Sequence, residues 1–208
     1  FLQPEKTRLR QEAQDAVRWV MQLRRIDALL GPMAAVRLIP DVMVVVARGG
    51  ETGFMVRDLR AFQDGDYILP ALSLPFVGRQ IARRHGEPFE SFWARHYAAA
   101  VGRAKARILS RYGLWFETPN PQNLLLRLDR SLQPRAEVVI RDVGDGECAT
   151  DAFESTDRPW SRLTHDLRPE TANSFWAFGE AGPHSVDGPT LEAWHRAHDD
   201  AYFAELAR

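Results

Sequence analysis

The chain has 208 residues, of which 45% are hydrophobic and 26% are charged, with a formal net charge of −1. This balance is typical of an ordinary globular chain of one domain or two small lobes, and it gives no support for a nucleic-acid or anionic-membrane surface. Cys148 is the only cysteine, which excludes an internal disulfide and a four-thiolate iron–sulfur site. No apolar run approaches the ~20 residues of a membrane span, and no signal peptide opens the sequence. We therefore expect a cytoplasmic protein with no nucleic-acid partner and no membrane partner.

The first third of the chain predicts one helix and a small antiparallel sheet. Apolar residues recur near a helical period through residues 4–30. Residues 33–39 are rich in β-forming side chains, and residues 42–62 contain two such runs on either side of a glycine-rich turn, which predicts a hairpin. The apolar stretch 67–72 is a candidate for a hinge strand that joins two lobes.

The rest of the chain is predominantly helical by pattern. A short helix is predicted over residues 75–85, and a long helix with an aromatic and alanine stripe is predicted over residues 88–111. A final helix is predicted over residues 191–207, with Thr190 as its N-cap. Together with the strand signals, this order predicts an α+β fold with a small antiparallel sheet lobe and a mostly helical C-terminal half.

A second hairpin carries the candidate chemistry. Leu124 to Leu128 is predicted as a strand, residues 129–135 as its turn, and residues 138–140 as the returning strand. Asn123 enters the first strand and Asp142 leaves the second, so antiparallel pairing is expected to bring the two side by side. An Asn and an Asp that converge in this way hold the Mg²⁺ of Mg·ATP in kinase-like folds. An ordinary hairpin with a polar loop is the alternative.

The sequence matches the protein-kinase motifs only in part. Asp142, Val143 and Gly144 fit the metal-binding triplet that follows the hairpin in kinases. Thr118 stands five residues before Asn123, where kinases have their catalytic base, and the nearest acid is Glu117. The predicted metal ligands are therefore present without the kinase base.

Several features in order are similar to one known family. They are a Tyr-Gly turn, a glutamate, a Gln-Asn pair and an Arg-Asp-x-x-Gly motif, at Tyr112-Gly113, Glu117, Gln122-Asn123 and Arg141-Asp142-Val143-Gly144. Residues 50–150 thereby resemble the C-terminal half of the NRPS-independent siderophore synthetases, the IucA/IucC family. Asn120 departs from that pattern, because the family has His there, and Glu117 lies one residue further from Asn123 than in the family.

The resemblance implies an ATP-dependent carboxylate–amine or carboxylate–alcohol ligase that forms an acyl adenylate, with ATP and Mg²⁺ as cofactors. It implies Asn123 and Asp142 as metal ligands, with Glu117 as a possible third. It further implies catalytic and nucleotide-binding roles for two sets of residues, Glu117, Asn120 and Arg141 for catalysis, and Arg57, Arg60, Gln122 and Asn123 for the nucleotide.

Arginine is expected to bind any phosphate, since Lys6 and Lys105 are the only lysines and neither lies in a P-loop motif. Arg57 shares a strand face with apolar residues, so it needs an anion. That anion is either a phosphate or a neighbouring carboxylate, Asp58 or Asp41.

The implied organisation is a kinase-like two-lobe arrangement, with a small sheet lobe over residues 1–72 and a helical lobe with the metal hairpin over residues 73–208. Its partners would be small-molecule carboxylate and amine or hydroxyl substrates. Because family members are two to three times longer, a homo-oligomer or a partner chain that supplies the missing N-terminal part is also expected. The alternatives are a kinase-like phosphotransferase whose base is Glu117 or Asp145, and a non-catalytic binding or assembly domain that retains the fold.

Overall fold

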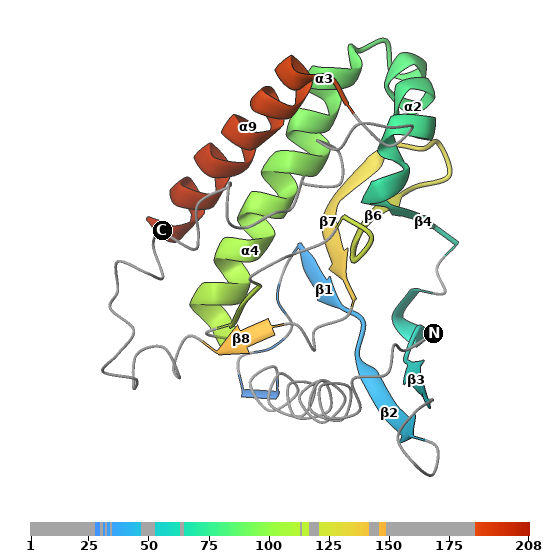
Figure 1. The fold of residues 1–208 in the computed structure, drawn as a ribbon, viewed down its shortest axis with the longest axis vertical. Coiled ribbons are helices and arrows are strands. Elements are labelled where there is room, and N and C mark those ends of the chain that lie inside the picture. The colour runs from blue at the N-terminus through green and yellow to red at the C-terminus, as the bar shows by residue number, and fades with distance from the viewer. Residues whose placement is uncertain are drawn as a thin grey trace.

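The computed structural model describes residues 28–29, 31, 33, 35–46, 53–62, 65–112, 114–116, 121–141, 146–148 and 186–208. These residues have mixed α and β content, with one four-stranded sheet, two two-stranded ribbons and a layer of helices (Figure 1). The strands are β1 (Val36–Leu38), β2 (Asp41–Val46), β3 (Gly53–Arg57), β4 (Tyr67–Pro70), β5 (Leu114–Phe116), β6 (Leu124–Leu128), β7 (Pro134–Ile140) and β8 (Gly146–Cys148). The helical segments are η1 (Arg60–Phe62), η2 (Ala71–Ser73), η3 (Leu74–Gly78), α2 (Arg79–Arg84), α3 (Phe89–Trp93), η4 (Ala94–Ala98), α4 (Ala99–Tyr112) and α9 (Gly188–Leu206).

Most predicted elements are confirmed. β2 and β3 pair as the expected antiparallel hairpin, and β6 and β7 pair as the second one. The predicted long helix is a continuous run of α3, η4 and α4, in which η4 is a π-helical segment. The predicted helix over residues 4–30 lies outside the described residues, apart from Ala28 and Leu29, which are helical.

The four-stranded sheet differs from the prediction in its strand partners. Its order is β1-β7-β6-β4, with β1 parallel to β7 and the other pairs antiparallel. β1 therefore does not belong to the predicted N-terminal sheet. Pro40 separates β1 from β2, and proline has no N–H to donate to a strand ladder. The predicted division at residue 72 passes through this sheet, because β1 and β4 precede it and β6 and β7 follow it, and the two-lobe arrangement stays a prediction.

The turn between β6 and β7 is built around Asp129. Its Oδ1 accepts hydrogen bonds from the backbone N–H groups of Ser131 and Gln133, at 2.8 and 3.0 Å, and from the Ser131 hydroxyl at 2.6 Å. The hydrogen bond with Ser131 lowers the pKa of Asp129. Leu132 has a φ of 66°, which a non-glycine residue seldom adopts. Its carbonyl oxygen lies 3.2 Å from His85 Nε2, at the end of α2, so this turn is tied to the helices.

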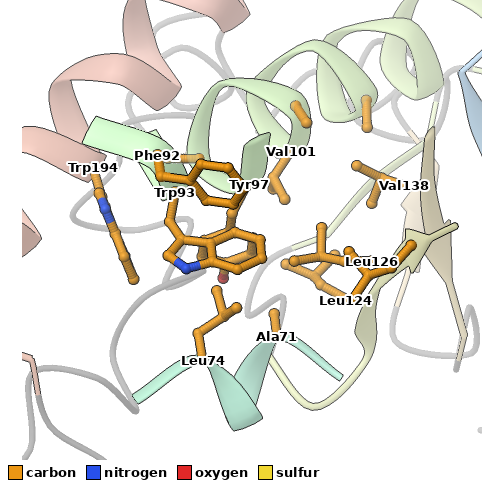
Figure 2. Packing of buried hydrophobic residues seen from close by; sticks show 14 of the residues in the cluster. Ala71, Leu74, Phe92, Trp93, Tyr97, Val101, Leu124, Leu126, Val138 and Trp194 are labelled. Carbon is orange, nitrogen blue, oxygen red and sulfur yellow. The ribbon is translucent and has the colours of Figure 1, made fainter. Parts of the chain in front are cut away.

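One face of the sheet packs on the helices and forms the core. Leu124 and Leu126 of β6 and Val138 of β7 meet a group of aromatic side chains on the helices (Figure 2). Trp93 and Tyr97 are fully buried there, and the Trp93 indole N–H donates to the Gly78 carbonyl oxygen at 3.0 Å. The alternation along β6 and β7 places every second side chain in this core, which holds the second hairpin in register.

Helices α4 and α9 lie side by side and run in the same direction (Figure 1). Near the start of the helical run, the Trp194 indole N–H donates to the Glu90 carbonyl oxygen at 3.1 Å, and at its end Arg107 Nε lies 2.8 Å from Glu205 Oε1. The predicted cap of α9 is wrong. Asp187 is the N-cap, and its carboxylate accepts the Thr190 N–H at 2.8 Å. Pro189 in the first turn allows the helix to begin before Thr190.

Candidate active site

The candidate site lies at the open end of the β6–β7 hairpin. The register pairs Leu124 with Ile140, so the next residues outward, Asn123 and Arg141, also face each other. The Arg141 N–H donates to the Asn123 carbonyl oxygen at 3.1 Å. The strand pairing therefore extends by one residue and places Asn123 beside Arg141. The predicted neighbour of Asn123 is Asp142, which follows Arg141 and lies outside the described residues.

The two side chains also meet. Arg141 Nε donates to the Asn123 amide oxygen Oδ1 at 3.4 Å, and both residues are partly buried. This is a long hydrogen bond, but a charged donor strengthens it. The amide oxygen of Asn123 is a hard oxygen of the type that Mg²⁺ prefers.

Pro121, two residues before Asn123, is bound to the residues that follow β4. The Pro121 carbonyl oxygen accepts the Leu72 N–H at 3.3 Å, and Pro70 of β4 pairs with Leu125 of β6. Gln122 is exposed to solvent. The stretch expected to act as a hinge is thus an edge strand of the same sheet that carries Asn123.

Three predicted site residues, Glu117, Asn120 and Asp142, lie outside the described residues. Within the described part of the chain there is no group of three or more His, Cys, Asp or Glu side chains that could hold a metal ion. Of the two predicted Mg²⁺ ligands, Asn123 and Asp142, the structure describes Asn123 alone, and the metal-binding role of both stays a prediction.

The predicted phosphate-binding arginines lie near the hairpin of β2 and β3. Arg57 ends β3, pairs in register with Asp41, and is partly buried. Arg60 follows in η1 and binds the Asp58 carboxylate, with Nε 2.8 Å from Oδ1. This carboxylate raises the pKa of Arg60. Because the Arg60 side chain is 82% exposed, it can exchange Asp58 for another anion at little cost.

An ionic network on the sheet face away from the helices was missed by the sequence analysis. Arg127 of β6 lies at its centre, with Nε 2.8 Å from Asp66 Oδ2 and Nη1 2.7 Å from Glu137 Oε2. Arg37 of β1 binds Glu137 at 2.6 Å, and Arg135 binds Asp66 at 3.2 Å. The available signal was the single arginine in the Leu-Leu-Leu-Arg-Leu run of β6, whose side chain must leave the core face.

A second polar cluster lies between α4 and α9. His198 is 1% exposed, and its Nδ1 lies 3.0 Å from Asp199 Oδ1. Burial lowers the pKa of His198 well below its ordinary value, burial lowers the pKa of Lys105 to about 7, and burial raises the pKa of Asp199. All three shifts favour the uncharged forms, as expected for titratable groups that a helix interface removes from water.

Two solved structures of one enzyme resemble this chain. One is ATP-bound aerobactin synthetase IucA from a hypervirulent pathotype of Klebsiella pneumoniae, with a TM-score of 0.53 and 18% sequence identity over 92% of this chain and 41% of that chain. The other is aerobactin synthetase IucA from the same pathotype, with a TM-score of 0.46 and 16% identity over 90% of this chain and 37% of that chain. No family model matches the sequence, and no curated protein matches it.

The likeness to the ATP-bound synthetase supports a siderophore-synthetase-like fold, and at 18% identity it concerns the fold alone. The chain spans about two fifths of that enzyme's length, since it covers 41% of it. Among the described helices, none is long and apolar enough to cross a membrane.

Proposed function

We propose that this chain is the nucleotide-binding part of an ATP-dependent ligase that joins a carboxylate to an amine or alcohol. The observation that carries the proposal is the β6–β7 hairpin, which sets the Asn123 amide oxygen beside Arg141, the residue before Asp142. The fold likeness to an ATP-bound synthetase supports the same reading.

In the proposed reaction, a substrate carboxylate oxygen attacks the α-phosphorus of ATP. The bond from that phosphorus to the bridging oxygen breaks, pyrophosphate leaves, and an acyl adenylate forms. An amine or hydroxyl then attacks the acyl carbon, loses its proton to solvent or a base, and releases AMP. Such chemistry depends on positioning and charge neutralisation more than on covalent help from the protein.

Each proposed residue has a defined part in this reaction. Asn123 and Asp142 would hold Mg²⁺, which when bound neutralises part of the triphosphate charge, and Glu117 is a possible further ligand. The cationic and polar groups proposed near the phosphates and the acyl group are Arg57, Arg60, Gln122 and Arg141, with Asn120 at the position of the family's His. A kinase-like two-lobe arrangement around the nucleotide is part of the proposal, with the four-stranded sheet joining strands from residues 1–72 to strands from residues 73–208.

The chain corresponds to 41% of the length of the synthetase, so most of that enzyme has no counterpart in this chain. We therefore propose that the remaining surface comes from a partner chain or from a second copy. The substrates would be a small-molecule carboxylate and an amine or alcohol, handled in the cytoplasm.

The products of ATP decide between the proposal and its alternatives. The full chain is incubated with Mg²⁺, a panel of di- and tricarboxylates, hydroxylamine as a general acceptor, and ATP labelled in the α-phosphate. AMP is expected. ADP would instead indicate a kinase-like phosphotransferase, and unchanged ATP without a nucleotide-induced rise in melting temperature would indicate a binding or assembly domain.

Asn123→Ala is the matching variant, and Gln133→Ala is its control, because Gln133 is an amide on the same hairpin at the opposite end from Asn123. AMP formation is expected to fall at least tenfold in Asn123→Ala, the loss usual for one transition-state contact or metal ligand. Gln133→Ala should leave it unchanged. Equal activity of the two variants would show that Asn123 takes no part in the reaction.

A further inference from the structure

A lysine lies at the interface between α4 and α9, where the two helices run side by side (Figure 1). Gly102 has no side chain to hold the helices apart, and it lies against the backbone of His198. Lys105 follows one helical turn later on the same side of α4 and is partly buried. Part of its side chain is therefore packed against α9, and part is accessible to a small reagent.

The groups of α9 around Lys105 give its ammonium little compensation for the water that it loses. Asp199 is the carboxylate that acts on Lys105, but its Oδ1 also lies 3.0 Å from His198 Nδ1. A positive charge on Lys105 opposes one on His198, whose pKa is lowered first by burial and then by Lys105 and His195. The cluster therefore favours an uncharged amine on Lys105.

The neighbouring arginines of α4 belong to a different group of charges. Arg107 Nε lies 2.8 Å from Glu205 Oε1, and Arg103 acts on the same carboxylate. Glu205 is thus engaged by arginines, and Asp199 is the carboxylate that stabilises a charge on Lys105.

The cationic residue at this position is one that can lose its charge. The chain has 27 lysines and arginines, of which only Lys6 and Lys105 are lysines. A guanidinium keeps its proton in proteins, whereas a desolvated ammonium gives it up readily. Burial lowers the pKa of Lys105 to about 7, so roughly half of the folded molecules carry a neutral amine there at neutral pH. The neutral amine is the nucleophilic form of lysine.

We propose that Lys105 is a site of acylation on Nζ by small mixed anhydrides of a carboxylic acid and a phosphate, the class that contains acyl phosphates and acyl adenylates. The Nζ lone pair attacks the acyl carbon and forms an amide bond. The bond from that carbon to the bridging oxygen breaks, the phosphate leaves with the electron pair, and the proton released from Nζ passes to water.

Two properties of the interface favour this class of donor. A phosphate leaves as an anion and needs no acid to protonate it, and the uncharged His198 and Lys105 offer no such acid. The product is an uncharged amide, which a partly buried position accepts more readily than an ammonium. The step needs no ligase activity of this chain, and the proposed ligase reaction forms an intermediate of the same class.

A lysine that serves only the packing of the helices predicts the opposite behaviour. Burial would then shield Nζ, and Lys105 would react more slowly than an exposed lysine. The proposed role requires Lys105 to react faster, because its larger neutral fraction outweighs its lower basicity and its partial burial. The order of the two rates therefore separates the two explanations.

The experiment uses the full chain with the substitution Arg196→Lys, which provides an exposed reference lysine on α9, since the Arg196 side chain is 71% exposed. The chain is treated with acetyl phosphate at neutral pH, and mass spectrometry of its peptides gives the acetylation rate at each lysine. Lys105 is expected to react roughly tenfold faster than the reference lysine. After unfolding in urea the two rates should be equal. A rate at Lys105 equal to or below that of the reference lysine in the folded chain would overturn the inference.

The pH profile of the same reaction is the second measurement. The rate at Lys105 should level off above its pKa of about 7, whereas the rate at the reference lysine should keep rising towards the ordinary 10.5. Asp199→Asn removes the charge that favours the ammonium, so it should move the Lys105 profile to lower pH. Asp200→Asn, at the exposed neighbouring carboxylate, should leave the profile unchanged. Coinciding profiles of Lys105 and the reference lysine would also overturn the inference, and the proposed ligase function would stand, because the acyl donor is supplied from outside.

Discussion

Gly102 of α4 lies directly against the backbone of His198 in α9, so that a Cβ atom on Gly102 would come within 2.2 Å of the His198 carbonyl oxygen. The same Cβ would lie 3.2 Å from the Tyr202 backbone nitrogen. These are backbone atoms inside a regular helix, and they cannot rotate away as a side chain would. The close parallel packing of α4 and α9 thus depends on the absence of a side chain at Gly102.

Gly102→Ala is expected to lower the free energy of unfolding by about 2 kcal/mol, within the range for overpacked sites. Alanine is the better helix former, so the loss would occur despite a favourable local change. The measurement is urea denaturation followed by circular dichroism. Gly188→Ala is the matched control, since a Cβ on Gly188 would meet nothing within 4 Å. Equal stability of the two variants would contradict the close contact.

A second prediction concerns pH and Lys105. Burial lowers the pKa of Lys105 to about 7 in the folded chain, from an ordinary 10.5 when unfolded. Between these values the unfolded chain binds a proton that the folded chain does not, so the stability of the fold should rise as the pH rises from 7 towards 10.5. Asp199 and His195, on the facing side of α9, belong to the same cluster. Lys105→Met should reduce the slope of the free energy of unfolding against pH by the contribution of about one proton.

The measurement is the free energy of unfolding at a series of pH values from about 7 to about 9.5, below the ordinary pKa of tyrosine. Burial raises the pKa of Tyr97 and of Tyr202, so at higher pH the unfolded tyrosines ionise first and stability falls. Arg196→Met serves as a control, because it also removes a positive charge, but from an exposed position on α9. If wild type and Lys105→Met have the same slope, Lys105 keeps its proton in the folded chain.

The elements that the sequence predicts correctly are those whose signals are local. The β6–β7 hairpin has an apolar run, a turn centred on Asp129 and a second apolar run within one short stretch, and the structure confirms its pairing. The position of Asn123 beside Arg141 follows from that pairing and needs no distant contact. The sequence predicts Asp142 beside Asn123, and this stays a prediction because Asp142 lies outside the described residues.

The features that the sequence does not predict depend on distant partners. β1 pairs in parallel with β7, with Val36 opposite Val138, and no local pattern chooses a partner so far along the chain. The network around Arg127 joins residues of β1, β6, β7 and the turn before β4, so it depends on the same sheet order. Thr190 was a reasonable cap by residue type, but Asp187 and Pro189 together start the helix earlier.

The third prediction tests Arg57. It is partly buried at the end of β3 and pairs in register with Asp41, whereas Asp58 is bound by Arg60. Arg57→Lys keeps the charge but loses the forked geometry that suits phosphate, so affinity for Mg²⁺–ATP should fall by roughly tenfold. Arg60→Lys is the comparison, and its effect should be smaller, because the Arg60 side chain is 82% exposed and a charge pair in solvent contributes little. Should Arg57→Ala lower the melting temperature while nucleotide binding is unchanged, Arg57 serves only the fold.

The fourth prediction concerns Asp142, the proposed principal ligand of Mg²⁺. Mg²⁺ is usually held by one or two carboxylates together with the phosphates of the substrate, so removal of one carboxylate should remove most of the metal affinity. Asp142→Asn removes one negative charge and keeps the shape of the side chain. It should abolish Mg²⁺-dependent nucleotide binding, measured by calorimetry. The melting temperature without nucleotide should stay the same or rise, because repulsion from Glu117 or Asp145 is relieved.

Asp129→Asn gives the opposite pattern and is therefore the control. Asp129 lies at the closed end of the same hairpin, where its carboxylate accepts hydrogen bonds from Ser131 and Gln133. Its pKa is lowered in the folded chain, chiefly by Ser131, so its ionised form stabilises the fold above the ordinary carboxylate pKa, and this stability is lost as the pH falls through the lowered value. Asp129→Asn should lower the melting temperature at neutral pH and leave Mg²⁺–nucleotide binding intact. If Asp142→Asn instead lowers the melting temperature as Asp129→Asn does, Asp142 is a structural partner of a neighbour such as Arg141, and the proposed Mg²⁺ site is wrong.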